Sequence, residues 1–596
     1  MARSDYRQER WSLEDLFPAL DAPQVGKALQ DIDHLVSEIE AYRPRLSDAL
    51  AADEFLALLG SYDRLMRLLS RLVGFAHLKF AEDTQDQQAQ TVLAQMQQRL
   101  AEIDNRTLFV KLWWKQLEEA SAQRLLAASG DFHYFLEALR LQRPHTLSEA
   151  EERVINLKDV NGPAALITLY DTITNRYTYR MQLDGRHEEL TRGELQVHIR
   201  GADPQARQAA YRVLHETHAR DAIVLGQVYQ YRVRDWRSEG VDLRHYASPL
   251  AVRNLSNDIP GEVVEALLGV CQEHAPLFQR YFRLKARWLG VDRLRRYDLY
   301  APVSSAAATR YSFDQAVDFV LDSFKQFDGG VADLAEKVFR SRHLDTEVRK
   351  GKRSGAFCAS IEPDLIPWVL TSYNGTADDV STLAHELGHA IHGLLASGHP
   401  ALTADASLPL AETASTFGEM LLVDHLQRAD PDPAVQRDLL FAQMDDAYAT
   451  IGRQAYFALF ERAAHDAVRQ GASVDDLSQL YFENLSGQFG ESLELSDDFR
   501  HEWLSIPHIY HTPFYVYAYA FGQLLVLSLY EQYQREGEAF KPRYLKILSA
   551  GGSDSPVRIL ERAGVAIRSP EFWGQGFGVL QRSLEKLEAI PITVAP

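Results

Sequence analysis

Three histidines and a glutamate lie close together in the segment STLAHELGHAIHG, which spans Ser381–Gly393. His385 and His389 are four residues apart, so a helix would project both imidazoles from one face. That spacing lets two imidazole nitrogens reach one zinc ion at about 2.0–2.1 Å. Glu386 is rotated off this face toward the remaining coordination position, where a carboxylate can take a proton from a water. The segment therefore predicts a site for one zinc ion, with Glu386 as the general base.

The flanking residues favour this interpretation over a chance match. In a chain with 20 histidines, the HExxH pattern alone would appear in roughly one sequence in twenty. Here Thr376 and Asp379 have the spacing of a capping box, which predicts the start of a helix. The preceding segment, Asp364–Gly375, is rich in β-branched and aromatic residues and predicts a strand. A strand that leads into a capped helix is the context that a metal-binding HExxH segment requires.

Spacing alone does not decide the third protein ligand. His392 shares the helix face but lies another ~4.5 Å along the axis, so one straight helix cannot easily direct three imidazoles at one ion. A carboxylate from a second helix is the better candidate, and Leu408–Leu426 predicts such a helix. Its Glu412 and Glu419 share a face but lie ~10 Å apart, so at most one of them is expected to bind the metal. Small neighbours that suit close helix packing are Ala411, Ala414, Ser415 and Gly418.

A second group of polar side chains lies near the C-terminus, in the segment HIYHTPFYVYAYA. Hydrolysis at a peptide carbonyl develops negative charge on the oxygen, which histidine and tyrosine donors can stabilise. The donors that this segment offers are His508, Tyr510, His511, Tyr515, Tyr517 and Tyr519. Burial tendencies predict that about half of these tyrosines are core residues of an aromatic helix.

The composition is that of an ordinary globular protein with an acidic surface. The chain has 596 residues, 63 basic and 83 acidic side chains, and a net charge of −20, which argues against nucleic acid or an anionic membrane as the main partner. Its two cysteines, Cys271 and Cys358, lie outside any CxxC pair and favour a cytoplasmic location. The N-terminal residues carry charge throughout, so no secretory signal is expected. Pro513–Tyr530 is uncharged but rich in tyrosine, which predicts a buried helix and not a membrane span.

Helical periodicity dominates the elements that would position these side chains. Apolar residues recur at three- and four-residue spacing in Ala52–Phe80 and in other long segments. The clearest exception is Arg176–Thr191, where alternating residues flank Asp184–Gly185 and predict a β-hairpin. We place a domain boundary near residue 190, between an N-terminal helical region, 1–190, and a larger region, 191–596, that carries the metal motif. The predicted fold class is mostly α with a small β component.

Several of these segments resemble the oligoendopeptidase F group of the thimet-oligopeptidase-like zinc metallopeptidases. The resemblance rests on AHELGHAIHG, on LPLAETASTFGEM, whose first glutamate follows His385 by 27 residues, on IPHIYHTPFYVYAYAFGQ and on GKRSGAFC. It covers roughly residues 176–523. The N-terminal third matches only loosely, through its helical content and the opening WSLEDLFP.

The resemblance implies which residue is the third metal ligand, a choice that spacing alone left open. It implies that His385, His389 and Glu412 hold one zinc ion per chain, and it thereby selects Glu412 over Glu419. His392 is a histidine in the family as well, and we expect it to support the site from outside the ligand set.

The resemblance also implies a fold and a set of donors. The expected architecture is a two-lobed helical zinc-peptidase fold, with a deep substrate channel and a small β-sheet beside the metal helix. The N-terminal region would form the lobe over the channel. His508 and one or more tyrosines are expected to face the substrate; we favour Tyr515 and Tyr510, then Tyr517. The strand in Asp364–Gly375 would pair its edge with an extended peptide, which predicts broad tolerance of substrate sequence.

These features together predict a zinc-dependent oligoendopeptidase that hydrolyses internal bonds of short unstructured peptides. A zinc aminopeptidase would carry a GxMEN-like stretch before the metal helix, and none is present. A carboxypeptidase of related helical shape stays open but fits the tyrosine segment less well. A non-catalytic peptide-binding protein would typically have lost at least one of four residues that are all intact here, His385, Glu386, His389 and Glu412. The sequence leaves the oligomeric state open.

Overall fold

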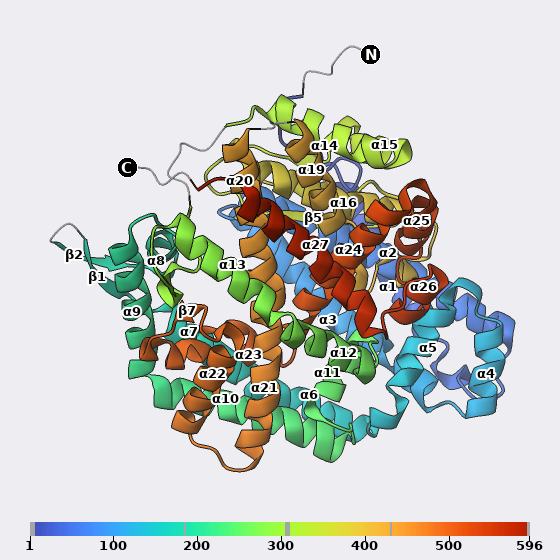
Figure 1. Cartoon of the computed structure of the whole chain (residues 1–596). Helices are drawn as coiled ribbons and strands as arrows, with labels where there is room; N and C mark the ends of the chain where they lie inside the picture. Colours follow the sequence, from blue (N-terminus) through green and yellow to red (C-terminus); the bar gives the residue numbers. More distant parts are fainter. Residues whose placement is uncertain (1–5, 184–185, 304–309, 430–431, 593–596) are drawn as a thin grey trace. The chain divides into compact units, whose positions relative to one another are not determined.

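The computed structural model describes residues 6–183, 186–303, 310–429 and 432–592 of the chain. Helices dominate these described residues and the strands are short, which confirms the mostly α fold class (Figure 1). Among these residues, no helix is both long enough and apolar enough to cross a membrane.

Packing groups the chain into two compact units, each built from three segments. The segments of the first unit are Met1–Arg143, Ala308–Ala429 and Gln532–Ala566, and those of the second are Pro144–Ala307, Asp430–Glu531 and Ile567–Pro596. The units do not follow a single division near residue 190, because segments from distant parts of the chain complete each core.

The first unit begins with long amphipathic helices. The apolar repeat expected at Ala52–Phe80 forms α2 (Ala52–Glu82), which packs against α1 (Pro23–Glu40) and α3 (Gln87–Gln116). Their buried leucines and isoleucines form one core with Trp368 of the small sheet. The other helices of this unit are α4 (Glu119–Ala127), α5 (His133–Leu141), α14 (Phe313–Phe327), α15 (Gly329–Arg340), α16 (Ala377–Leu395), α17 (Ala401–Ala404), α18 (Leu408–Ala411), α19 (Ser415–Ala429), α25 (Lys541–Ser549) and α26 (Pro556–Arg562).

A three-stranded sheet in the first unit has the order β4–β6–β5. Its strands are β4 (Leu344–Asp345), β5 (Phe357–Ala359) and β6 (Trp368–Leu370). β6 pairs in parallel with β4 and antiparallel with β5, so both of its edges are occupied. The strand expected in Asp364–Gly375 therefore forms, but the prediction that its edge receives a peptide is wrong. β5 is the edge strand that packs against α16.

The second unit is also helical and contains the predicted hairpin. β1 (Tyr179–Leu183) and β2 (Arg186–Leu190) pair antiparallel, while the predicted turn residues Asp184–Gly185 lie outside the described residues. A parallel pair joins β3 (Leu294–Arg295) to β7 (Leu493–Glu494). The helices of this unit are α6 (Glu149–Asn161), α7 (Pro163–Asn175), α8 (Arg192–Ile199), α9 (Pro204–Arg220), α10 (Ala222–Arg237), α11 (Pro249–Asn257), α12 (Gly261–Glu273), α13 (Ala275–Trp288), α20 (Pro433–Ala447), α21 (Arg453–Arg469), α22 (Val474–Phe489), α23 (Pro507–His511), α27 (Pro570–Ala589) and α24 (Tyr517–Glu536), which begins in this unit.

Candidate metal centre

The helix that carries the HExxH motif starts as the sequence predicts. Thr376 caps α16, and its hydroxyl accepts a hydrogen bond from the backbone N–H of Asp379. The Asp379 carboxylate in turn accepts from the backbone N–H of Thr376 at 2.9 Å. This capping box satisfies two backbone donors that the first helical turn leaves unpaired.

Glycines bring α16 and the following segment unusually close. A Cβ on Gly388 would lie 2.6 Å from both the Ala414 carbonyl oxygen and the Ser415 Cα, so only glycine fits there. A Cβ on Gly418 of α19 would lie 3.2 Å from the Ala384 carbonyl oxygen. α14, α16 and α19 pack on one another in this region (Figure 1). The close packing predicted from the small residues after Ala411 is thus confirmed.

The segment Leu408–Leu426 is not the single helix that its sequence predicts. α18 ends at Ala411, a turn follows, and α19 begins at Ser415. The Ser415 hydroxyl donates to a carboxylate oxygen of Glu412 at 2.7 Å, and the Tyr544 hydroxyl donates to the carbonyl oxygen of Thr413 at 2.9 Å. These side chains take up acceptors in the turn, and Glu412 consequently projects from the turn and not from a helix face.

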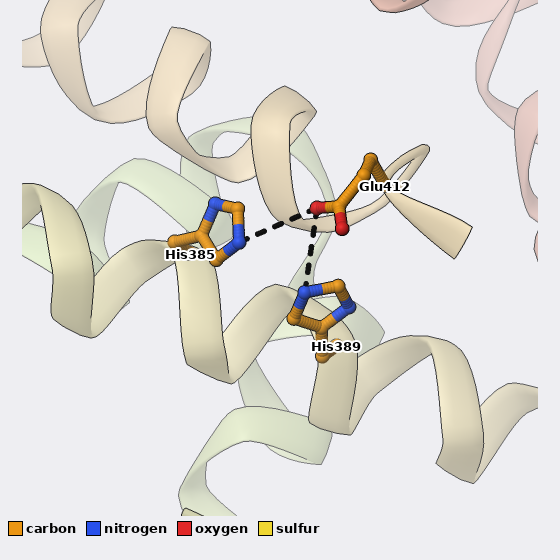
Figure 2. Close-up of side chains that lie close together, drawn as sticks. All are labelled: His385, His389 and Glu412. Atoms are coloured by element: carbon orange, nitrogen blue, oxygen red, sulfur yellow. Dashed lines mark ion pairs between the residues drawn. The ribbon is translucent and has the colours of Figure 1, made fainter. Parts of the chain in front are cut away.

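The turn places Glu412 against both histidines of α16. One carboxylate oxygen, Oε2, lies 3.3 Å from Nε2 of His385 and 3.4 Å from Nε2 of His389 (Figure 2). The two imidazole planes are inclined by 81°, with ring centroids 4.9 Å apart. One ligand atom from each of the three residues falls within 4.8 Å of the others.

The two nitrogen–oxygen distances suit ligands of a tetrahedral metal ion. Ligand atoms at about 2.0–2.2 Å from a tetrahedral zinc ion are about 3.3–3.5 Å from one another, which matches the two nitrogen–oxygen distances. Burial alone would raise the pKa of Glu412, but the neighbouring His389 and the Ser415 hydroxyl lower it to about 2. Burial alone would lower the pKa of His385, but the neighbouring Glu419 and Glu412 raise it to about 9. The carboxylates therefore favour positive charge at the position where a cation would bind.

Glu419, the rival candidate ligand, has a different position. Its Oε1 lies 2.6 Å from Nδ1 of His385, and its Oε2 accepts from the Ser381 hydroxyl at 3.0 Å. In the neutral form of His385, which a bound cation would favour, a proton on Nδ1 that is shared with Glu419 leaves the Nε2 lone pair free on the side of Glu412. Helical spacing predicts both glutamates as candidate ligands but does not predict this contact with Nδ1.

Glu386 lies in the same cavity as the three clustered residues. The cavity has a volume of about 570 Å³, and Glu386, His385, His389 and Glu412 all line it. The side chain of Glu386 is buried, and this burial raises its pKa despite the opposing effect of the two histidines. A carboxyl group with a raised pKa is suited to accept a proton and then to release it.

His392 stands outside the three-residue cluster. It is buried, hydrogen-bonds to the backbone of Ala411, and has a pKa that burial lowers to about 4. Ala411 directly precedes Glu412, so a neutral His392 ties α16 to the turn that holds the carboxylate.

The edge strand β5 contributes residues that the sequence reasoning missed. Cys358 and Ala359 of β5 and the following Ser360 line the same cavity as His385. In the sequence, the segment GKRSGAFC ends at Cys358 and so includes the first two residues of β5.

Three aromatic side chains of the second unit form a half-buried group. The rings of His508 and Tyr515 are parallel within 6° at 6.4 Å, and the Tyr519 hydroxyl lies 3.4 Å from Nε2 of His508. Burial lowers the pKa of His508, aided by the nearby His511. At neutral pH, a neutral His508 can present one N–H donor.

Two of the tyrosines proposed as donors are interior residues. Tyr510 has no exposed surface and stacks on Tyr170 with ring centroids 3.9 Å apart. Tyr517 is also fully buried, and its hydroxyl accepts a hydrogen bond from Asn257 at 2.9 Å. In this conformation neither hydroxyl is accessible to a substrate, in line with the expectation that about half of the tyrosines are core residues.

The loop between α23 and α24 is held by a buried glutamate and a half-buried arginine. Phe514 has a φ of 58°, which is unfavourable for a non-glycine residue. Its backbone N–H donates to Glu461 of α21 at 2.9 Å, and the Arg253 side chain donates to the carbonyl oxygen of Pro513 at 3.2 Å. These two contacts fix the backbone immediately before Tyr515.

Comparison of the chain with known proteins identifies the family to which it is similar. The model of Peptidase family M3 matches residues 197–579, and the model described as Oligopeptidase F matches residues 113–179. The gap between the two matches includes the boundary expected near residue 190.

Curated relatives and solved structures agree with these matches. Oligopeptidase PepF of Bacillus subtilis is 26% identical over 99% of this chain and 89% of its own length. Group B oligopeptidase PepB of Streptococcus agalactiae is 29% identical over 88% of both chains. A protein of Chlamydophila abortus has a similar fold, with a TM-score of 0.89, 24% identity and 99% coverage of both chains. The oligoendopeptidase F of Enterococcus faecium has a TM-score of 0.72 and 22% identity, with 95% of this chain and 98% of that chain covered.

Proposed function

This chain belongs to peptidase family M3, and on that premise we propose that it is a zinc-dependent endopeptidase that cleaves internal bonds of short unstructured peptides. The observation that carries the proposal is the position of one Glu412 oxygen, 3.3 and 3.4 Å from the Nε2 atoms of His385 and His389. This spacing suits three ligands of one tetrahedral ion. A fourth position would then be left for water or substrate.

The residues around the cluster have separable roles in this proposal. His385, His389 and Glu412 would hold the ion, which supplies a Lewis acid that polarises a carbonyl group and lowers the pKa of a water. Glu386 takes a proton from the attacking water while the water oxygen bonds to the scissile carbonyl carbon. It then delivers that proton to the amine nitrogen as the C–N bond breaks.

The substrate backbone would lie along the edge of β5. Pairing with an edge strand uses backbone donors and acceptors, so it orders a peptide in an extended form without reading its sequence. A folded protein offers few segments free to adopt that form. This supports a preference for short unstructured peptides.

We assign the remaining donors to His508 and Tyr515. Both are half-buried and lie within one aromatic group, and both belong to the segment that resembles the oligoendopeptidase F group. A donor that meets the developing negative charge on the carbonyl oxygen would accelerate the reaction. Tyr519 shares this group and is an additional candidate.

Glu386→Gln gives the first test of the proposal. The substitution keeps the size of the side chain but removes its basic carboxylate. We expect about one zinc ion per chain, as in the parent protein, and a fall in kcat of roughly 10²–10⁴-fold. Metal analysis and cleavage of internally quenched peptides measure both quantities. Substantial retained turnover would remove Glu386 from its role.

Peptides with blocked termini separate endopeptidase from exopeptidase activity. We expect cleavage of doubly blocked peptides at internal bonds, abolished by a chelator and restored by zinc. Loss of activity on blocked peptides alone would favour an aminopeptidase or a carboxypeptidase. Zinc binding without any hydrolysis would favour a non-catalytic peptide-binding protein.

Both cysteines are free, which supports a reducing compartment such as the cytoplasm as the site of this activity.

A further inference from the structure

A second cavity of about 300 Å³ lies beside the metal cavity in the first unit. One wall is a single face of α2, where Met66, Leu69, Ser70 and Val73 recur at helical spacing. The opposite wall is the chain that follows β5, from Ser360 to Pro367. We refer to this cavity as the apolar recess.

The apolar recess adjoins the metal cavity. Four residues, Ser360, Gly393, Ala404 and Asp405, line both cavities. Gly393 lies on α16 four residues after His389, so the shared wall stands about one helical turn, or ~5.4 Å, beyond that histidine. A Cβ on Gly393 would lie 2.6 Å from the Ser360 hydroxyl oxygen, which explains the glycine between the two cavities.

The walls of the apolar recess are suited to a hydrocarbon side chain. Most of the lining comes from aliphatic residues and prolines; Leu69 belongs to the buried core, and the partly buried Leu100 packs against that core. The carboxylate of Glu362 lies 3.5 Å from the Arg71 guanidinium, so its charge is partly compensated. Asp405 lines both cavities, and an acidic residue there would disfavour an acidic substrate side chain.

The edge strand connects the two cavities. β5 ends at Ala359, and the next residue, Ser360, belongs to the shared wall. A peptide extended along β5 would point alternate side chains to opposite sides, with ~3.3 Å between successive residues. A side chain within about two residues of the bond held at the metal would therefore reach the recess.

We propose that the apolar recess is the subsite that selects an aliphatic or aromatic side chain of the peptide, close to the scissile bond. This inference rests on the proposed peptidase function. It adds a preference that backbone pairing cannot supply: Leu or Phe over Ala, and rejection of Asp, at one position of the substrate.

Substitutions that change the size of the recess test this proposal. Internally quenched peptides would carry Ala, Leu, Phe or Asp at each of the two positions on either side of the cleaved bond, located by mass spectrometry. We expect kcat/KM for Leu to exceed that for Ala by about tenfold or more at one position. Val73→Phe, which narrows the recess, should reduce that ratio at least fivefold, while Leu100→Ala should favour Phe over Leu.

The matched control is Leu56→Phe, the same kind of enlargement at an exposed site on α2. It should leave every ratio unchanged. The Kd of each peptide can also be measured by fluorescence anisotropy on a Glu386→Gln background. The ratios of these Kd values report on the subsite without turnover. If the parent enzyme binds these peptides but cleaves none, the proposed function fails and the Kd ratios still decide the subsite. A Leu-to-Ala ratio that Val73→Phe leaves unchanged, together with a Phe-to-Leu ratio that Leu100→Ala leaves unchanged, would overturn the subsite.

Discussion

At the scale of single residues, the two glutamates of one segment divide two tasks. Glu412 directs an oxygen toward both Nε2 atoms, while Glu419 lies against Nδ1 of His385. A hydrogen bond to the far nitrogen of a metal-binding histidine fixes its tautomer and its ring orientation. We therefore expect metal binding to depend on both carboxylates, although only Glu412 belongs to the three-residue cluster.

Glu419→Gln separates these two tasks. The amide of the variant can still contact Nδ1 of His385. It lacks the negative charge with which the Glu419 carboxylate attracts the Nδ1–H group. We expect zinc affinity to fall by about 10–100-fold, measured by competition with a chromophoric chelator. The matched variant Glu412→Gln alters the cluster itself and should cost more. Equal zinc affinity in Glu419→Gln and the parent protein would contradict the positioning role.

Tyr515→Phe and Tyr517→Phe compare a half-buried tyrosine with a buried one. We expect Tyr515→Phe to lower kcat by about 10²-fold or more without a change in thermal stability, because a donor to the oxyanion is lost. Tyr517→Phe should lower the free energy of unfolding by about 1 kcal/mol, since it removes the hydrogen bond with Asn257, and should leave kcat nearly unchanged. The reverse pattern would exchange the two assignments.

At the scale of elements, α21 stabilises the strained loop before Tyr515. Glu461 is completely buried, and burial raises its pKa to about 8, although the bond from the Phe514 N–H opposes that shift. The folded protein therefore retains a proton that the unfolded chain releases near pH 4.5. The contribution of Glu461 to stability is largest below pH 4.5 and falls as the pH rises to about 8.

Glu461→Gln should remove this pH dependence. Gln keeps an oxygen acceptor for the Phe514 N–H and does not ionise. The free energy of unfolding of the variant relative to the parent protein should increase between pH 4.5 and 8, by roughly 4–5 kcal/mol in total, and stay level above that range. Urea denaturation at several pH values measures it. A difference that does not vary with pH would show that Glu461 is ionised in the folded state.

At the scale of the whole molecule, the metal cluster belongs entirely to the first unit. A ligand that binds only the folded state stabilises it by about 2.7 kcal/mol at a concentration 100 times its Kd. Zinc should therefore stabilise the packing of α16 and α19 most directly.

Chelation tests this localised effect. We expect removal of zinc to lower the Tm and to speed amide exchange in α16 and α19, with a smaller change in α10 and α21 of the second unit. Hydrogen-exchange mass spectrometry measures both regions in one experiment. His385→Ala is the control, since its exchange should not respond to the chelator. Equal loss of protection in both units would contradict a site confined to the first.

The sequence by itself determined the local features of this protein. The capping box at Thr376, the pairing of His385 with His389 on one helix face, and the hairpin after Arg176 all depend on neighbours within a few residues. Short-range hydrogen bonding and fixed helical spacing are enough to specify such features.

Only the tertiary structure decided what depends on packing between distant segments. The turn that projects Glu412 is held by Tyr544 from 131 residues away, and its close approach to α16 requires Gly388. β6 is the central strand because it pairs with both β4 and β5. Tyr517 is an interior residue that hydrogen-bonds to the distant Asn257. Local periodicity carries no information about such partners, because an edge strand and a central strand, or a core tyrosine and a half-exposed one, have the same short-range pattern.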